Sequence, residues 1–300
     1  MGRGPGPGRF RRRGAAVGRA ESPARPARAL TIAGSDSGGG AGIQADLKTF
    51  CAFGVYGMSA LTAITAQNTL GVAAAAPLSP ELVRAQIDAV VTDIGVDACK
   101  TGMLANRAIV LEVAAALARG GLGPVVVDPV LVSKHGDPLL ETLARDTLRA
   151  ELLPLAMILT PNLPEAAVLL GCDPRELGSL TARRQAAAAL CALGPRHVVL
   201  KGGHAAAGAP GEGDQAVDVW CDGQSTTDLA APRIQTRHTH GTGCTFSAAI
   251  TAGLALGRPI AGAIAAAKEF ITWAIAHAPG LGGGSGPVNH LRLRGHGGWV

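Results

Sequence analysis

Aromatic residues are scarce in this sequence, at 3% of 300 residues. A chain with so few rings cannot build the stacking platforms that bind single-stranded nucleic acid. An aromatic-rich β-sandwich is equally disfavoured. The 42 glycines and the 47% hydrophobic content instead favour one globular α/β protein with tight glycine turns.

A basic surface is also missing from most of the chain. The formal net charge is +5, but residues 1–28 hold eight arginines against the single acid Glu21. That segment carries about +7 and the remainder about −2, which is not the charge of a nucleic-acid-binding domain. The Gly-Pro-Arg composition of residues 1–28 predicts a disordered extension or a start codon placed too far upstream, with targeting or surface binding as alternatives.

Paired cysteines are absent as well. The six cysteines are widely spaced and never form the C-x-x-C pattern of metal or redox sites, which suits a reducing compartment. The uncharged stretch 241–257 contains several Gly, Ser and Thr residues and ends at Arg258-Pro259, so it predicts a buried helix and not a membrane span. We therefore expect a cytoplasmic protein without a membrane segment.

Short apolar runs that end in turn residues alternate along the chain with Ala- and Leu-rich helical patterns, which is typical of parallel strands joined by crossover helices. The expected strands are residues 29–33, 58–65, 98–102, 125–128, 157–160 and 197–201. The expected helices are residues 42–53, 80–93, 107–119, 138–152, 163–170 and 181–193, followed by two helices that begin at Gly243 and near Pro259. Segments 217–220 and 226–234 predict a small antiparallel hairpin, and no break in composition indicates a second folded domain.

Both common nucleotide-binding fingerprints are missing. No G-K-[ST] sequence occurs, and the glycines of residues 34–42 do not have G-x-G-x-x-G spacing. That segment nevertheless follows a predicted strand and precedes a helix, so its backbone amides could approach a ligand. A tight turn capped by Asp36 or Ser37 explains the same residues equally well.

A stronger signal lies in residues 239–244, Thr-His-Gly-Thr-Gly-Cys, before an Ala-rich helix. Two glycines beside Thr242 at a helix start leave N–H donors and the positive end of the helix dipole free to bind phosphate. Cys244 falls in the first turn, where we expect a lowered thiol pKa and a role in accepting a hydroxyl proton. The alternative is a small buried hydrophobic residue. This segment predicts phosphoryl transfer to a small molecule.

Polar residues that suit a nucleotide and a metal follow other predicted strands. Lys201 ends one strand and could reach a phosphate, although a lysine in that position can also be simply solvated. Asp128 ends another, at the carboxyl edge of the sheet, where ligands bind. Asn162 and Glu165 either cap a helix or hold a hydrated Mg²⁺ beside phosphates.

A series of segments in fixed order connects the chain with one known family. They are AGSDSGGGAGIQADLKTF (33–50), TAITAQNT (62–69), KTGML (100–104), DPV (128–130), LTPNLPEA (159–166), KGGH (201–204), APRI (231–234), THGTGC (239–244) and GPVNH (286–290). Through them, residues 29–290 resemble the hydroxymethylpyrimidine/phosphomethylpyrimidine kinases of the ribokinase-like superfamily. The resemblance implies a three-layer α/β/α fold with a mostly parallel central sheet and a small antiparallel hairpin. Residues 1–28 and 291–300 match nothing in the family, and we treat them as tails.

The resemblance also implies a reaction, namely phosphorylation of 4-amino-5-hydroxymethyl-2-methylpyrimidine by ATP and Mg²⁺, first to the monophosphate and then to the diphosphate. The residues that it implies around the pyrimidine are Gln67, Gly34, Asp46, Met103 and Val130. Those that it implies around the nucleotide and metal are Lys201 and Asn162 for ATP, Asp128 and Glu165 for Mg²⁺, and Gly241, Thr242 and Gly243 for an anion hole. Cys244 stands where most ribokinase-like enzymes carry an aspartate base. A homodimer is a further implication.

Other activities compete with this interpretation. Some relatives with the same cysteine motif phosphorylate pyridoxal or pyridoxine, so a pyridoxal kinase or a dual-specificity enzyme is the nearest alternative, although Gln67-Asn68 favours the pyrimidine. A non-catalytic sensor is disfavoured because the anion hole, Lys201 and the Asn162–Glu165 pair are all present. An oxidoreductase would lack its dinucleotide fingerprint. Residues 133–137, Ser-Lys-His-Gly-Asp, are either a lid or an ordinary surface loop.

Overall fold

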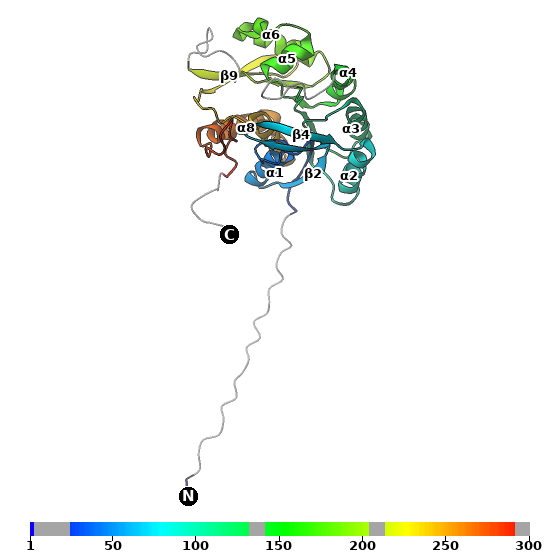
Figure 1. The fold of residues 1–300 in the computed structure, drawn as a ribbon, viewed down its shortest axis with the longest axis vertical. Helices are drawn as coiled ribbons and strands as arrows, with labels where there is room; N and C mark the ends of the chain where they lie inside the picture. Colours follow the sequence, from blue (N-terminus) through cyan, green and yellow to red (C-terminus); the bar gives the residue numbers. More distant parts are fainter. Residues whose placement is uncertain (3–24, 132–141, 204–213, 292–300) are drawn as a thin grey trace.

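The main sheet of the protein is mixed and mostly parallel. The computed structural model describes residues 1–2, 25–131, 142–203 and 214–291. Within them, the strands follow the order β10-β9-β8-β7-β6-β5-β1-β2, with β9 and β10 antiparallel at one edge (Figure 1). The strands are β1 Arg28–Ala33, β2 Tyr56–Leu61, β5 Ala98–Thr101, β6 Val125–Val127, β7 Ile158–Leu159, β8 His197–Leu200, β9 Gln215–Cys221 and β10 Thr226–Pro232.

Helices cover both faces of this sheet, which confirms the predicted three-layer arrangement. One face carries α1 Gly42–Ala52, α7 Thr242–Ala255 and α8 Ile260–Ala276. The other carries α2 Pro80–Asp93, α3 Arg107–Arg119, α4 Thr142–Thr147, α5 Leu163–Leu170 and α6 Leu180–Cys191, with a π-helical turn at Leu148–Leu152 and 3-10 turns at Leu153–Leu155 and Pro174–Leu177.

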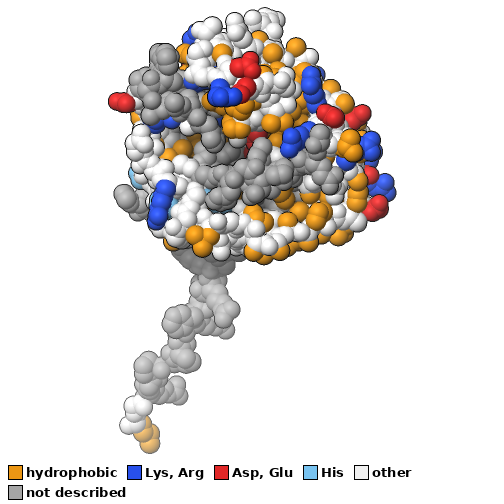
Figure 2. Space-filling model, turned by 45° about the horizontal axis from the view of Figure 1, so that its top comes forward, with side chains coloured by type: hydrophobic (Ala, Val, Ile, Leu, Met, Phe, Trp, Pro, Cys, Tyr) orange, Lys and Arg blue, Asp and Glu red, His pale blue; other side chains and the backbone are white. Residues whose placement is uncertain are grey.

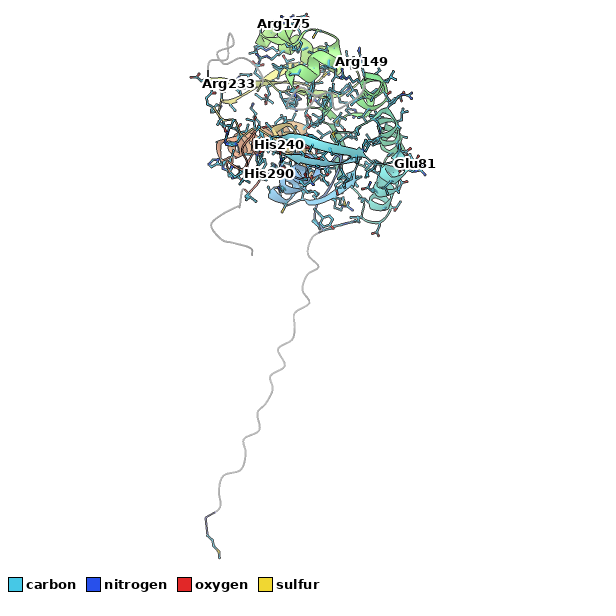
Figure 3. The ribbon with its side chains drawn as sticks, viewed as in Figure 1. Glu81, Arg149, Arg175, Arg233, His240 and His290 are labelled. Carbon is cyan, nitrogen blue, oxygen red and sulfur yellow. The ribbon has the colours of Figure 1, made fainter. Side chains whose placement is uncertain are left out.

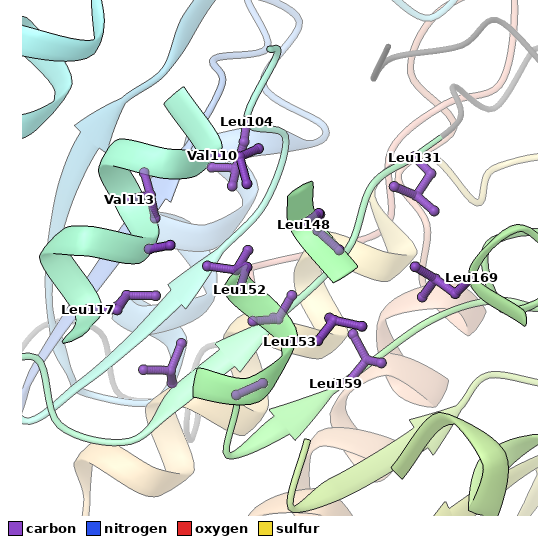
Figure 4. Close-up of a cluster of buried hydrophobic side chains, with 14 of the residues drawn as sticks. Leu104, Val110, Val113, Leu117, Leu131, Leu148, Leu152, Leu153, Leu159 and Leu169 are labelled. Atoms are coloured by element: carbon purple, nitrogen blue, oxygen red, sulfur yellow. The ribbon is translucent and has the colours of Figure 1, made fainter. Parts of the chain in front are cut away.

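Strand β6 explains why both faces are covered. Its three valines are buried, and because side chains alternate along a strand, Val125 and Val127 join the α2–α6 core while Val126 joins the α7–α8 core. Parallel strands buried on both faces read as uninterrupted apolar runs, as this one does. Figure 4 shows part of the larger core, where Leu148 and Leu152 of the π-helical turn lie close to α3.

The predicted strand 58–65 is wrong as a single element. The chain leaves the main sheet at Thr62, whose N–H donates to the Ala33 carbonyl (3.0 Å) and whose hydroxyl donates to the Met103 carbonyl (2.6 Å). Beyond this break, β3 Ala63–Asn68 pairs with β4 Gly71–Pro77 in a separate antiparallel sheet. We call this hairpin the flap. Its second strand was not predicted, because Gly-Val-Ala-Ala-Ala-Ala-Pro has little β-propensity.

The remaining elements agree well with the sequence pattern. The hairpin expected within residues 217–234 is formed by β9 and β10, and the helices expected at 80–93, 107–119 and 163–170 have those bounds. The helix expected at 138–152 is present from Thr142 as α4 and the π-helical turn, while residues 138–141 lie outside the described part of the chain. The lid candidate 133–137 also lies outside it.

Two features of the described residues bear on membranes and nucleic acid. None of their helices combines the length and the hydropathy that a membrane crossing requires. On the face shown in Figure 2, Lys and Arg side chains are interspersed with Asp and Glu and form no continuous basic stripe. This distribution agrees with the near-neutral charge calculated for the chain beyond its first 28 residues.

Candidate active site

A cavity of about 870 Å³ lies at the carboxyl edge of the parallel strands. Residues that follow β1, β5, β6, β7 and β8 line it, together with the inner face of the flap, the start of α7 and one side of α8. Such edges are the usual ligand sites of open α/β sheets, and the volume suits two small ligands side by side.

The start of α7 is built as an anion site. Gly241 is the N-cap in the left-handed conformation (φ 77°), and a Cβ there would overlap the carbonyl oxygen of Gly40. A Cβ on Gly243 would lie 3.1 Å from the Lys201 Nζ. The Thr242 hydroxyl donates to the Thr239 carbonyl (2.7 Å) and closes the turn. No side chain caps the helix, so its first N–H groups face the cavity with the positive end of the dipole.

Cys244 lines the cavity in the first turn of α7, but the expected lowering of its thiol pKa is wrong. Burial raises the pKa of Cys244 to about 12, the ammonium of Lys100 opposes this rise, and the carboxylates of Asp46 and Asp128 reinforce it. Loss of hydration outweighs the helix dipole here. The thiol is therefore neutral at pH 7 in the site without ligands.

Lys201 is not the solvated lysine that its position at a strand end allowed. Its Nζ lies 3.2 Å from Asp128 Oδ1, and both side chains are largely buried. Burial would lower the pKa of Lys201, but Asp128 and Glu165 outweigh it and hold that pKa above its usual value. The other oxygen of Asp128 accepts a hydrogen bond from the Ser247 hydroxyl (3.3 Å). A fixed positive charge therefore stands beside the anion site.

Asn162 and Glu165 form a capping box at the start of α5 and also line the cavity. Asn162 Oδ1 accepts from the Glu165 N–H and Glu165 Oε2 accepts from the Asn162 N–H, both at 2.9 Å. Burial, and more weakly the Asp128 charge, raise the pKa of Glu165 to about 7, while Lys201 opposes the rise. The same two residues form the helix cap and part of the cavity wall, so the capping interpretation is confirmed and the pair is also placed where a ligand could reach it.

The donor set suits Mg²⁺ better than a metal held by protein ligands alone. Within the described part of the chain, no group of three or more His, Cys, Asp and Glu side chains is placed to hold a metal. The Asp128 carboxylate lies close enough to Glu165 to raise the pKa of that carboxyl. Mg²⁺ is commonly bound through one or two carboxylates together with substrate phosphates and water, which is what these two residues could provide.

Four of the five residues predicted around a pyrimidine line the same cavity: Gln67, Gly34, Met103 and Val130. A Cβ on Gly34 would lie 2.5 Å from Met103 Cε, so the glycine allows the methionine to pack directly against this turn. Val130 has a positive φ of 37°, a strained conformation of the kind found at ligand sites.

The fifth residue, Asp46, does not belong to the cavity wall. It is fully buried beneath the wall, where its carboxylate accepts from Lys100 Nζ (2.8 Å) and from the Thr31 hydroxyl (2.7 Å). Of these two side chains, Lys100 lines the cavity and Asp46 does not. Asp46 therefore contributes by holding Lys100. In the sequence, Lys100 stands out only as part of the segment KTGML, which assigns it no role.

Asp36 and His240 were also missed as a pair. The Asp36 carboxylate accepts from the amides of Gly38 (2.8 Å) and Ala41 (2.8 Å) and from His240 Nε2 (2.9 Å). Burial would raise the pKa of Asp36, but these hydrogen bonds outweigh it and hold the pKa below its usual range. The turn expected at Asp36 is present. Through His240 it also holds residues 34–42 against the segment just before α7. No sequence pattern pairs residues 204 positions apart.

Comparison with known proteins decides the family. The phosphomethylpyrimidine kinase family matches residues 36–289. The chain belongs to the phosphomethylpyrimidine kinase family. It is 54% identical over 268 residues to a hydroxymethylpyrimidine/phosphomethylpyrimidine kinase of Streptomyces coelicolor, covering 89% of this chain and 96% of the relative. A Bacillus subtilis relative with the same description is 47% identical, with the same coverage.

Solved structures connect this kinase family with pyridoxal kinases. A phosphomethylpyrimidine kinase of Clostridium difficile has a TM-score of 0.71 and 43% identity, covering 83% of this chain and 99% of its own. A pyridoxal kinase of Staphylococcus aureus in complex with AMP-PCP and pyridoxal has a TM-score of 0.79 and 36% identity, covering 89% and 94%. The ribokinase-like fold expected from the sequence is thereby confirmed.

Proposed function

We propose that this chain transfers the γ-phosphoryl group of ATP to 4-amino-5-hydroxymethyl-2-methylpyrimidine and then to the resulting monophosphate, supplying the pyrimidine half of thiamine. The observation that carries the proposal is one cavity lined both by Gly34, Gln67 and Met103, where the ring would bind, and by the start of α7, where helix N–H groups could meet a phosphate. Relatives about half identical in sequence carry the name of this activity.

In this proposal Gln67 recognises the aminopyrimidine. Its side-chain amide offers a donor and an acceptor in one plane, which matches a ring nitrogen beside an exocyclic amine. The Thr65 hydroxyl lies 3.2 Å from Gln67 Oε1 and fixes the amide. His240 Nε2 lies 2.9 Å from Asp36, so its proton is engaged there and the nearby Gln67 amide nitrogen remains available to the ring.

The transferred phosphoryl group would lie over Gly241 and Gly243, between the ring and the nucleotide. Its charge would be met by the α7 amides and by Lys201, and a Mg²⁺ held through Asp128 and Glu165 would supply further neutralisation. Asn162 would stand beside the nucleotide phosphates. The apolar side chains of Ile234, Ile271 and Ile275 at the far end of the cavity suit a purine base.

The role of Cys244 in the proposal follows from its neutral thiol. Phosphoryl transfer passes through a loose transition state in most analyses, so positioning and charge neutralisation matter more than a strong base. Cys244 would accept a hydrogen bond from the substrate hydroxyl and hold it in line for attack, and the hydroxyl proton would pass to an oxygen of the transferred phosphoryl group as the new P–O bond forms. A thiol with so high a pKa stays protonated and serves by its position.

We also propose a homodimer, formed through the outer face of the flap. The inner face, with Thr65, Gln67, Val72 and Ala75, lines the cavity. Strand alternation puts the partners Ile64–Ala76 and Ala66–Ala74 on the other face, and all four are exposed. An uncharged, unprotected strand pair of this kind readily associates with a second copy.

The use of ATP and six free thiols suit the cytoplasm, which we retain as the proposed location.

Pyridoxal phosphorylation is the second candidate, favoured by the likeness to a pyridoxal-bound kinase. The deciding experiment measures ADP release by the purified chain with the hydroxymethylpyrimidine, its monophosphate and pyridoxal in parallel. We expect turnover of both pyrimidines at a higher kcat/KM than pyridoxal. Turnover of pyridoxal alone would replace the proposal by the second candidate, and no turnover of any would refute both.

A further inference from the structure

The segment that follows α8 lies between the flap and residues 239–243 at the start of α7, which we call the phosphate loop. We call residues 282–290 the strap. On one side, the Ser285 N–H donates to the Thr69 carbonyl (3.0 Å) and the Gly284 N–H donates to the Thr69 hydroxyl (3.3 Å). Thr69 is in the turn of the flap, two residues beyond Gln67. The strap therefore holds the part of the flap nearest the ring end of the cavity.

On its other side the strap holds the residue before the anion site. The His240 N–H donates to the Gly286 carbonyl (3.0 Å) and the His240 carbonyl accepts from the Val288 N–H (3.2 Å). These two bonds form a parallel bridge between His240 and Pro287 and use both backbone groups of His240. Gly241 is the next residue along the chain, so the strap sets where the phosphate loop begins.

The far end of the strap is fixed to the two helices beneath it. The Asn289 N–H donates to the Ala274 carbonyl of α8 (3.0 Å), and the Thr245 hydroxyl lies 2.8 Å from His290 Nε2 in a buried pair. Thr245 is in the first turns of α7, close to Cys244. Figure 3 labels His240 and His290, which lie on the same side of the molecule near α8. The anchored strap cannot shift without moving the start of α7.

Packing leaves almost no free space along this connection. A Cβ on Gly284 would overlap the Thr69 carbonyl, and a Cβ on Gly286 would lie 2.5 Å from the Leu281 carbonyl oxygen. A Cβ on Gly40 would lie 2.6 Å from the His240 ring and 3.0 Å from Pro287. Close-packed contacts transmit small displacements instead of absorbing them.

We propose that the strap is a positioning element that couples occupation of the ring site to the geometry of the phosphate loop. This inference rests on the proposed function and deepens it. A ring bound at Gln67 fixes the flap turn at Thr69, the strap carries that position to His240, and the amides after Gly241 are thereby set for phosphate. The two ligands then strengthen each other's binding, because a coupling free energy between two sites is reciprocal.

Two neighbouring glycines provide the test. Gly284→Ala pushes the strap away from Thr69, whereas Gly283→Ala makes the same chemical change one residue earlier and meets only Leu70 Cδ2 at 3.9 Å, an ordinary contact. Calorimetry measures the Kd of AMP-PCP with and without saturating 4-amino-5-hydroxymethyl-2-methylpyrimidine. In the parent chain and in Gly283→Ala we expect the pyrimidine to tighten AMP-PCP binding by roughly fivefold or more.

In Gly284→Ala we expect AMP-PCP alone to bind within about twofold of the parent, while the effect of the pyrimidine falls to nearly none. Parent-like coupling in Gly284→Ala, or no coupling in the parent chain, would overturn the inference even if both pyrimidines are phosphorylated. If Gly284→Ala does not fold, Thr69→Val removes one acceptor and keeps the backbone bond, and unchanged coupling there would overturn it as well. A parent chain that phosphorylates no pyrimidine refutes the proposed function, a separate outcome.

Discussion

At the scale of single residues, Cys244 illustrates how surroundings can reverse an expectation. A helix start favours the thiolate, but this side chain has lost its hydration and lies near two carboxylates, so its pKa rises to about 12. A thiol with that pKa contributes no ionisation between pH 6 and 9. Its contribution to catalysis must come from its position beside the substrate hydroxyl.

We predict that Cys244→Ala lowers kcat by on the order of 10², since misplacing a reacting hydroxyl by about 1 Å can cost about that much. The Kd of AMP-PCP should stay the same, because the α7 amides and Lys201 remain. Steady-state kinetics and calorimetry measure the two quantities, and Cys51→Ala, at an exposed cysteine, serves as control. Full activity of Cys244→Ala would return this residue to the role of a small buried side chain.

We predict that Gln67→Leu raises the KM for the pyrimidine by roughly tenfold to a hundredfold, because a buried ring amine loses its partner. The kcat at saturation should change much less. Activity with pyridoxal, measured on the same preparation, should fall less than activity with the pyrimidine. An unaltered KM for the pyrimidine would show that another residue recognises the ring.

The Glu165 carboxyl predicts a pH dependence. Its pKa is raised to about 7 by burial, and only the ionised form can hold Mg²⁺, so kcat/KM at limiting Mg²⁺ should rise with pH up to about 7 and level off above it. Assays across pH 6 to 8 at several Mg²⁺ concentrations measure this, and excess Mg²⁺ should shift the rise to lower pH.

Glu165→Gln should abolish that rise along with most of the activity. Glu176→Gln is the matched control, because Glu176 forms the same capping box with Asp173 away from the cavity. A rise near pH 7 that persists in Glu165→Gln would assign it to another group.

At the scale of elements, the strap anchors α7 through the neutral side chain of His290. Burial lowers the pKa of His290 to about 4, from an ordinary value of 6.5. Above pH 6.5 the group is neutral in both states. Below it the unfolded chain binds the proton first, so the stability of the fold falls as the pH drops from 6.5 to 4.

We predict that His290 accounts for a loss of roughly 3 kcal/mol in the free energy of unfolding over that range. His290→Gln should be less stable at pH 7 but should lose less stability on acidification. Urea unfolding at pH 7, 5.5 and 4.5 measures the difference, with exposed His277→Gln as control. Equal acid sensitivity in the parent and in His290→Gln would contradict this account.

At the scale of the whole molecule, the two faces of the flap have different tasks. Its inner face closes one side of the cavity, and its outer face presents Ile64, Ala66, Ala74 and Ala76 without a charge. β4 crosses the view of Figure 1 between α8 and α3. Association through the outer face would cover an open strand pair and stiffen one wall of the active site.

We predict that Ala66→Arg converts the proposed homodimer to a monomer, because a charge would be buried without a partner in the proposed interface. Light scattering after size exclusion measures the mass. Ala115→Arg, at an exposed alanine of α3, should leave the mass unchanged. A parent chain that is monomeric at micromolar concentration would refute the dimer.

The sequence alone determined the layers and most of the residues around the cavity. Alternating apolar runs predict parallel strands with crossover helices, because the period of burial depends only on local backbone geometry. Glycines beside Thr242 predict the anion site, because a helix start is also a local feature of the backbone. Lys201 and the Asn162–Glu165 pair were indicated by their places after predicted strands. The family resemblance added Gln67, Gly34, Met103 and Val130.

Only the tertiary structure decided the rest. The Ala-rich strand β4 is held by pairing with β3 and not by propensity, so no local pattern indicated it. The pairs Asp36–His240 and Lys100–Asp46 join distant positions, and the same packing removes water from Cys244 and moves Asp46 behind the wall. Hydration and charge at a site depend on every segment folded against it, which is information that the order of residues along one segment does not contain.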